Sequence, residues 1–212
     1  MNRKFISKSN YVLRKVLNQE KSLDIIKDFI EQVLEIKISK IILREYLKEC
    51  SDYLPKEEDF GMVNVRIIDE KGKEKNVGIQ FIDGYYIQSK ILLYYAQIHM
   101  IQDKYKTNNT VVETTTINIL NCEIFKIKEL YKPITICGSK DKIKDFENVD
   151  LHILEIPKFI EKRNIIENKK DAWMAYFAGI DDKMIEEAKE KDNKIEKLDN
   201  MLDEYWENEM LN

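Results

Sequence analysis

Hydrophobic positions in the first quarter of the chain recur at helical spacing. The stretch Tyr11–Leu17 predicts a short first helix, and Ser22 suits the N-cap of a second one. The apolar positions of that second helix are Leu23, Ile26, Phe29, Ile30, Val33 and Leu34. Residues 36–47 are rich in β-branched side chains and predict a strand at their start. Residues 51–60 are polar and predict a loop.

The pattern then changes to alternation with period two. Residues 62–68 and 76–82 flank a turn at 69–73 that contains Gly72, so they predict a β-hairpin. One face is apolar and consists of Val63, Val65, Ile67, Val77, Ile79 and Phe81. The opposite face presents Asn64, Arg66, Gly78 and Gln80. Because positions 64 and 78 are nearly equidistant from the turn, we expect them to be neighbours across the ladder.

In the second half of the chain, segments with helical spacing of apolar residues alternate with segments of period two. It predicts a long helix at 85–102, strands at 114–120, 132–137 and 151–156, and a packed helix at 171–179. The apolar side of the long helix consists of Ile87, Ile91, Leu92, Tyr94, Tyr95, Ile98 and Ile101. This order of elements predicts an α/β fold with a mixed sheet flanked by helices.

Residues 180–212 predict one charged amphipathic helix, appended to a domain of residues 1–179. Its apolar positions are Met184, Ala188, Ile195, Leu198, Leu202 and Tyr205, a heptad-like series with one gap, at Lys191. A helix with one apolar stripe must bury it against its own domain or another chain. The stripe continues past Trp206, longer than one small domain usually covers, so we expect a homodimer through this helix.

Composition favours a folded domain, since 43% of the 212 residues are hydrophobic and the chain has only 6 Gly and 3 Pro. Charge is unevenly distributed. From Asp181 onward there are 12 acidic residues and 5 lysines, which leaves 30 basic and 27 acidic residues in 1–180. A mildly basic body is compatible with a polyanionic partner but does not require one.

The cysteines and the N-terminus indicate the compartment. Cys50, Cys122 and Cys137 are odd in number and widely spaced, which fits buried free thiols in a reducing environment better than a disulfide framework or a zinc site. The N-terminus has no apolar run behind its charges, and no stretch approaches the length of a membrane span. We therefore expect a cytoplasmic protein that does not associate with membranes.

A hairpin with one polar face, followed by a helix, can organise a metal-dependent phosphodiesterase. Such a site needs an Asp on one strand and, on the next, a Glu two positions before a Lys or Gln. The carboxylates and a backbone carbonyl hold Mg²⁺, and the Lys or Gln orients the attacking water. Positions 64, 78 and 80 have this spacing.

The chain resembles the PD-(D/E)XK nuclease family transposases, the Rpn-like recombination-promoting nucleases, over most of its length. The resemblance lies in Tyr11-Val-Leu-Arg-Lys-Val-Leu17, Asp28-Phe-Ile-Glu-Gln-Val-Leu34, Gly61-Met-Val-Asn-Val-Arg66, Asn76-Val-Gly-Ile-Gln80, Lys90-Ile-Leu-Leu-Tyr-Tyr95 and Leu151-His-Ile-Leu-Glu-Ile-Pro-Lys158. The fifth of these resembles the family's Arg-x-x-Tyr-Tyr helix, and the last resembles its later strand that ends in Lys. The resemblance implies a restriction-endonuclease-like fold.

The departures from the family pattern concern the metal ligands. Position 64, Asp in the family, is Asn64, and position 78, the Glu of the Glu-x-Gln motif, is Gly78, while Gln80 matches. Mg²⁺ relies on carboxylates, so the resemblance implies a catalytically degenerate protein that needs no cofactor. We expect it to act by binding DNA or a protein partner.

Two other readings stay open. Displaced acids at Glu58, Asp59 or Asp83 would make the chain an active Mg²⁺-dependent DNA endonuclease. Alternatively, the chain is the remnant of a mobile element and has no present role.

Several other polar and aromatic residues are expected to have no catalytic role. Neither His99 nor His152 has a Cys or Asp partner at ligand spacing, so both are expected to have packing or surface roles. If DNA binds, we expect phosphate contacts from Lys104, Lys106 and the Lys140–Lys144 cluster. The aromatic residues expected in the core and at its rim are Tyr85, Tyr86, Tyr94 and Tyr95.

Overall fold

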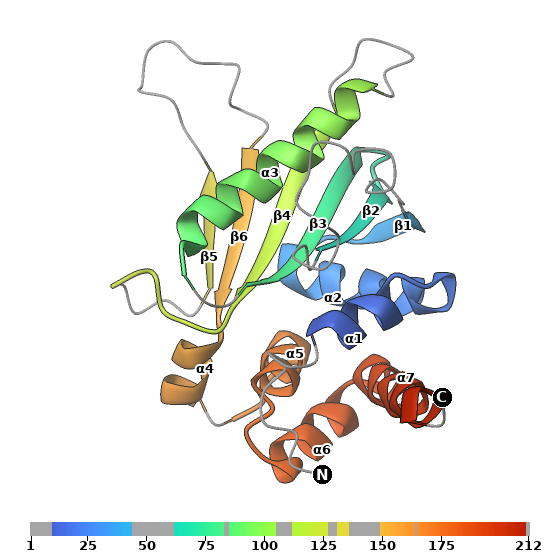
Figure 1. Cartoon of the computed structure of the whole chain (residues 1–212), viewed down its shortest axis with the longest axis vertical. Helices are drawn as coiled ribbons and strands as arrows, with labels where there is room; N and C mark the ends of the chain where they lie inside the picture. Colours follow the sequence, from blue (N-terminus) through green and yellow to red (C-terminus); the bar gives the residue numbers. More distant parts are fainter. Residues whose placement is uncertain are drawn as a thin grey trace.

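The centre of the molecule is a six-stranded mixed sheet (Figure 1). The computed structural model describes residues 10–43, 62–82, 85–104, 112–126, 131–135, 149–163 and 165–210. The strands are β1 (Ile38–Leu43), β2 (Met62–Asp69), β3 (Glu74–Ile82), β4 (Glu113–Leu120), β5 (Tyr131–Thr135) and β6 (Val149–Glu155). They lie in the order β1-β2-β3-β4-β6-β5. The pairs β3–β4 and β4–β6 are parallel and the others antiparallel, which confirms the predicted α/β fold with a mixed sheet.

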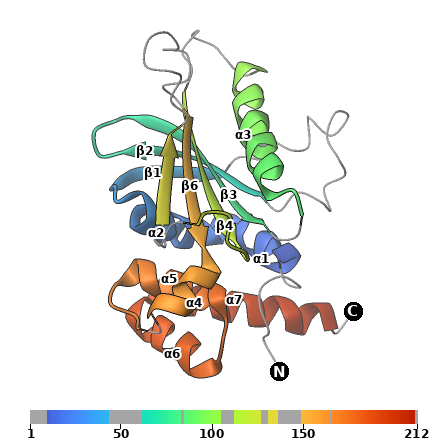
Figure 2. The same ribbon diagram turned by 90° about the vertical axis from the view of Figure 1, so that its left-hand side faces the viewer.

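Helices cover both faces of this sheet. They are α1 (Asn10–Leu17), the 3₁₀ turn η2 (Glu20–Ser22), α2 (Leu23–Leu34), α3 (Ile87–Lys104), α4 (Ile156–Arg163), α5 (Lys169–Ala178), α6 (Asp182–Lys191) and α7 (Asn193–Met210). Figure 2 shows α3 on one face of the sheet, while α4 to α7 gather beyond one end of it. A smaller apolar cluster fills the space beneath α3, and the main core lies on the opposite face.

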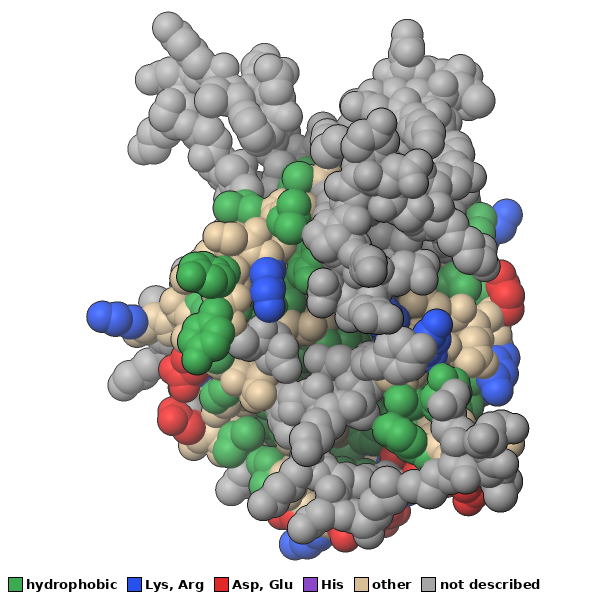
Figure 3. Space-filling view, viewed as in Figure 1, with side chains coloured by type: hydrophobic (Ala, Val, Ile, Leu, Met, Phe, Trp, Pro, Cys, Tyr) green, Lys and Arg blue, Asp and Glu red, His purple; other side chains and the backbone are tan. Residues whose placement is uncertain are grey.

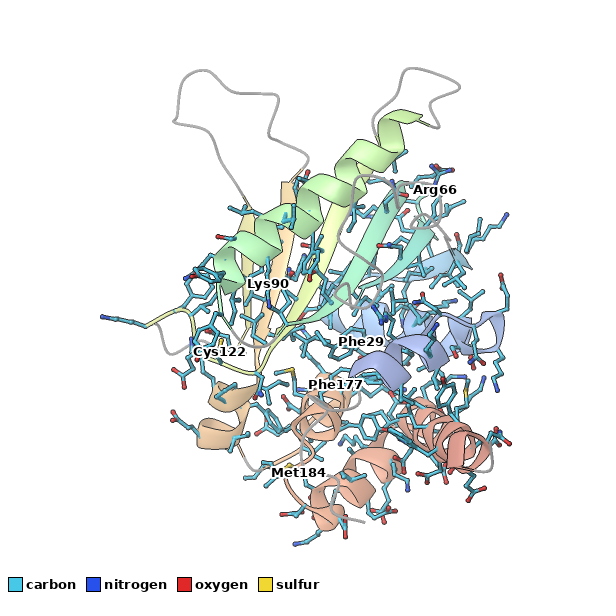
Figure 4. The ribbon with its side chains drawn as sticks, viewed as in Figure 1. Phe29, Arg66, Lys90, Cys122, Phe177 and Met184 are labelled. Atoms are coloured by element: carbon cyan, nitrogen blue, oxygen red, sulfur yellow. The ribbon has the colours of Figure 1, made fainter. Side chains whose placement is uncertain are left out.

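The main core is built around the aromatic contacts between α2 and α5. The ring of Phe29 lies edge-on to that of Phe177, with 5.4 Å between the centroids, and 5.3 Å from the ring of Trp173 (Figure 4). Helix α5 begins where Asn168 accepts a hydrogen bond from the backbone of Asp171. It ends at Gly179, whose φ of 53° is easily adopted by glycine. The predicted packed helix at 171–179 is confirmed.

The predicted hairpin is confirmed in its strands, its turn and its register. Gly72 has a φ of 79°, and the Asp69 carboxylate accepts hydrogen bonds from the backbone N–H groups of Lys71 and Lys73. Asn64 pairs with Gly78, as equal distance from the turn requires. The apolar face of the hairpin is buried in the main core.

The strand predicted at 151–156 is confirmed as β6, which ends one residue earlier, at Glu155. Helix α4 begins at once, and Pro157 lies in its first turn, where the missing N–H is not needed. One prediction for the long helix was wrong. Leu92, assigned to the buried side of α3, is 52% exposed. Helix α3 carries apolar residues on most of its circumference, so periodicity alone did not select the buried stripe.

The single C-terminal helix predicted for 180–212 was also wrong. Asp192 has extended backbone angles between α6 and α7, and its carboxylate accepts a hydrogen bond from the N–H of Lys194. The break falls beside the gap in the heptad-like series at Lys191. The buried stripe residues pack into the main core of the same chain and are Met184, Ala188, Ile195 and Leu198. Leu202, Tyr205 and Trp206 are partly buried against the same core.

No helix in the described part of the chain combines the length and the apolar character needed to cross a bilayer.

Candidate functional site

The polar face of the hairpin continues onto the neighbouring strand β4. Gly78 pairs with Asn64 on β2 and with Thr116 on β4, and Gln80 pairs with Asn118 on β4. Alternation along β3 places Asn76 and Gln80 on the same side as Gly78. This side faces α3, because Ile82 and Leu120, which continue it, pack in the cluster beneath that helix.

The carboxamides on this face are buried, and each keeps at least one atom without a hydrogen-bond partner among the described residues. Asn64, Asn76, Gln80 and Asn118 are each at most 6% exposed. The side-chain atoms that lack a partner among the described residues are Asn64 Oδ1, Arg66 Nε, Asn76 Oδ1 and Nδ2, Gln80 Oε1 and Nε2, and Asn118 Oδ1. Each such group costs about 1–3 kcal/mol, and folded proteins contain few of them. Their grouping on one face of the sheet makes this face the candidate site. We call these five residues, with Gly78, the polar patch.

Asn118 is a member of the polar patch that sequence reasoning missed. Its Nδ2 donates to the hydroxyl of Thr116 at 3.0 Å and to the backbone carbonyl of His152 at 3.2 Å. The amide nitrogen is therefore held down on the sheet, and Oδ1 is the atom left without a partner. The alternation of Thr116 and Asn118 with the buried Ile117 and Ile119 was the available signal.

Arg66 is the cation of the patch. Its Nη1 lies 3.7 Å from the carboxylate of the exposed Glu74, while Nε is buried. In Figure 4, Arg66 lies on β2 towards the end of the sheet that is remote from α4–α7. The guanidinium therefore gives this end of the patch a positive charge that the solvent-exposed Glu74, in a loose ion pair, offsets only in part.

The other acid on this face, Glu155, is engaged elsewhere. It forms a buried ion pair with Lys158 and accepts hydrogen bonds from the backbone N–H groups of Ile124 and Phe125. These contacts tie the segment after β4 to the start of α4. Burial, and then the charge of Glu155, raise the pKa of the half-buried Cys122 thiol, so this cysteine stays protonated at neutral pH. Cys50 and Cys137 lie outside the described residues.

The donor set of the patch does not fit a hard dication. Asn64 offers a neutral amide oxygen, Gly78 offers no side chain, and Arg66 repels a cation. Within the described ranges, no group of three or more His, Cys, Asp or Glu side chains is placed to hold a metal ion. Glu58, Asp59 and Asp83 lie outside these ranges, as do Lys106, the Lys140–Lys144 cluster and the side chains of Lys104 and His99.

His152 has an acidic partner, contrary to the prediction. Its Nε2 lies 3.0 Å from Asp150, two residues earlier on the same side of β6, and Thr115 donates to the other carboxylate oxygen at 3.1 Å. Although burial alone would raise it, the pKa of Asp150 is lowered by His152 and Thr115. Both side chains bind the same carboxylate and they lie on the sheet face opposite the patch, so this group ties β4 to β6.

The four tyrosines divide into two pairs. Tyr94 and Tyr95 belong to α3 and contact the cluster between this helix and the sheet, where Tyr94 is buried and Tyr95 half-buried, as predicted for core and rim aromatics. Burial raises the pKa of Tyr95. Tyr85 and Tyr86 are 86% and 82% exposed, so the same prediction was wrong for them. Tyr86 has a left-handed φ of 61° at the start of α3. Figure 3 views the molecule from the α3 side and shows hydrophobic side chains gathered there.

Comparison with known proteins gives one match. A family model described as PD-(D/E)XK nuclease family transposase matches residues 7–210. No match was found among curated proteins or among solved structures.

Proposed function

The chain belongs to the PD-(D/E)XK nuclease family transposases, and we propose that it is a catalytically inactive member that acts by binding, with DNA as its partner. The observation that carries this proposal is the pairing of Asn64 with Gly78 at the centre of the polar patch. These are the two positions at which the family's motifs have carboxylates, while Gln80 keeps the family's residue.

The loss of both carboxylates removes the chemistry that the family implies. A Mg²⁺-dependent phosphodiesterase needs anionic oxygens to hold the ion and to position the attacking water. Asn64 is isosteric with Asp but neutral, and Gly78 supplies no ligand. Removing a catalytic group commonly raises a barrier by about 4 kcal/mol or more, and here two are absent.

Binding is the role that the remaining features support. The polar patch keeps a set of buried hydrogen-bonding groups. Among the six residues that define the patch, Arg66 is the one with a charged side chain. Residues 1–180 carry a small basic excess, and the excess of acidic over basic residues lies in the C-terminal part from Asp181 onward. Both features are compatible with a polyanionic partner such as DNA. A DNA-binding role also fits the cytoplasmic location that we propose.

The proposal is tested by titrating a labelled DNA duplex with the full-length protein in EDTA and following fluorescence anisotropy. We expect saturable binding that weakens as salt rises, because phosphate contacts release counterions. If DNA fails to bind at low salt, DNA is ruled out as the partner and a protein becomes the candidate.

The second candidate function is that of an active DNA endonuclease with displaced acids. Glu58, Asp59 and Asp83 would supply the ligands in that case. It predicts Mg²⁺-dependent cleavage that is lost when these residues are replaced. A remnant without a role predicts neither cleavage nor DNA binding.

A further inference from the structure

Gly78 is the centre of a ring of polar side chains on the α3-facing side of the sheet. Asn64 and Thr116 lie beside it on the neighbouring strands, and Asn76 and Gln80 lie two residues before and after it on β3. Adjacent strands are about 4.8 Å apart and positions i and i+2 about 6.6 Å apart, so these side chains surround one small area. Because Gly78 has no side chain, the centre of the ring is backbone.

The side of the ring nearest Arg66 is rich in hydrogen-bond donors. Arg66 pairs across the ladder with Asn76, and Arg66 Nε and Asn76 Nδ2 are both buried N–H groups without a described partner. Asn64 lies two residues from Arg66 on the same strand. Its amide can present either oxygen or nitrogen, because rotation of the amide group exchanges the two. Two donor side chains, one of them charged, therefore lie side by side at this edge of the ring, next to the amide of Asn64.

The charge of this area decides what class of ligand it fits. With carboxylates at positions 64 and 78 it would carry a net negative charge that offsets Arg66 and recruits a cation. With Asn64 and Gly78 the guanidinium is the only charge among the patch residues, and the exposed Glu74 at 3.7 Å offsets it only in part. Charge-assisted hydrogen bonds to an oxyanion then become the strongest interactions that these side chains offer. Asn118, whose oxygen lacks a described partner, lies at the corner of the patch diagonally opposite Arg66.

We infer that the polar patch binds a phosphate group directly, without a metal ion, through Arg66, Asn76 and Asn64 over Gly78. The substitutions that remove the metal ligands thus turn a cation site into an anion site. The inference deepens the proposed DNA binding and rests on it for the source of the phosphate. The shared chemistry is a phosphate oxyanion, whether it is free or part of a nucleic-acid backbone.

The test uses inorganic phosphate and the full chain, titrated by calorimetry in EDTA with chloride as the background anion. We expect saturable binding to the wild type and binding at least about tenfold weaker to Arg66→Gln, which loses a charge-assisted contact. Lys40→Gln is the matched control. It removes the same charge from an exposed position on β1, in register with Ile68, and is expected to bind like the wild type.

A thermal melt checks whether Arg66→Gln is folded. A second variant keeps the test decisive if Arg66→Gln does not fold. Asn76→Asp keeps the size of the side chain and places a negative charge beside the ligand, so it is expected to weaken phosphate binding by at least about tenfold as well. Unchanged phosphate binding in a folded Asn76→Asp or Arg66→Gln variant overturns the inference, as does the absence of binding to the wild type.

The same variants are titrated with the labelled DNA duplex in EDTA. Parallel losses of phosphate and DNA binding support both proposals. Phosphate binding that depends on Arg66, without any DNA binding, supports the phosphate site and rules out DNA as its source. DNA binding that is unaffected by both substitutions leaves the proposed function standing and overturns the inference that the patch contacts the DNA phosphates.

Discussion

Asn64 and Gly78 are direct partners across the β2–β3 ladder, at the centre of a buried polar face that extends onto β4. An amide stands opposite a residue without a side chain at the two positions where we infer, from the resemblance to the family, that a metal-dependent nuclease has its carboxylates. Gln80, two residues along β3, and its partner Asn118 on β4 are buried and keep amide atoms without a described partner. On this proposal the arrangement of the site is kept without the charges that bind a dication.

Restoring those charges is expected to restore a cation site. In Asn64→Asp combined with Gly78→Glu, two carboxylates face each other across the ladder, so Mn²⁺ should bind at least about tenfold more tightly than to the wild type, as measured by calorimetry. Gly78→Gln is the matched control, because it adds nearly the same bulk without charge. No gain over this control would mean that the surrounding residues no longer support the site. Glycine in a strand can also mark a place that no side chain enters, so both variants need a thermal melt.

The C-terminal helices are expected to be part of the folding unit. Leu198 of α7 is fully buried in the main core, so Leu198→Ala should lower the free energy of unfolding by about 2–5 kcal/mol in urea. Leu202→Ala, four residues later and only partly buried, is the control and should cost less. Deletion after Gly179 exposes the same core and should give insoluble protein. Equal, small losses for both leucines would contradict the packing of α7.

A pair of carboxylates between α2 and the start of α7 predicts a pH-dependent stability. Burial and the neighbouring Asp192 raise the pKa of Asp28, which also accepts a hydrogen bond from Trp173 at 3.0 Å and lies 3.5 Å from Lys169. Because the folded state binds this proton more tightly than the unfolded state, the contribution of Asp28 to stability falls as pH rises through its folded pKa.

Asp28→Asn removes this titration and keeps an oxygen acceptor for the Trp173 N–H. We expect the variant to melt above the wild type at pH 7, by on the order of 2 °C. The difference should shrink as the pH falls through the folded pKa of Asp28 and vanish below the lower pKa that this carboxyl has in the unfolded chain. Asp28→Ala is the contrasting variant and should lose about 1–3 kcal/mol, because the buried Trp173 N–H is left without its acceptor. A difference between Asp28→Asn and the wild type that grows at low pH would refute the assigned direction of the shift.

Self-association through the C-terminal part of the chain remains a prediction, but fewer residues are left to form the dimer interface. The stripe as far as Met201 is buried in the chain's own core, so a dimer through α7 would use the residues after it, around Tyr205 and Trp206. Light scattering of the full-length protein should give twice the monomer mass, and Trp206→Glu should give the monomer. A monomer mass for the wild type would show that α7 serves only its own domain.

The parts of the fold that were predicted correctly are those that depend on local sequence patterns. The hairpin has period-two alternation and a turn with Gly72, and these two features set the pairing of Asn64 with Gly78. Asn118 was missed because β3 and β4 are joined by a long crossover through α3, and the register of a parallel pair cannot be read from a turn. The break at Asp192 was missed because a heptad-like series can continue across a change of helix.

The central claim is the absence of metal-dependent cleavage, and an assay with supercoiled plasmid and single-stranded DNA tests it most directly. The protein is incubated with Mg²⁺ or Mn²⁺ alongside the Gln80→Ala variant. The account predicts that wild type and variant leave both substrates intact, because positions 64 and 78 supply no carboxylate. Cleavage by the wild type that requires the metal and disappears in Gln80→Ala would contradict it and would establish an active site with displaced acids.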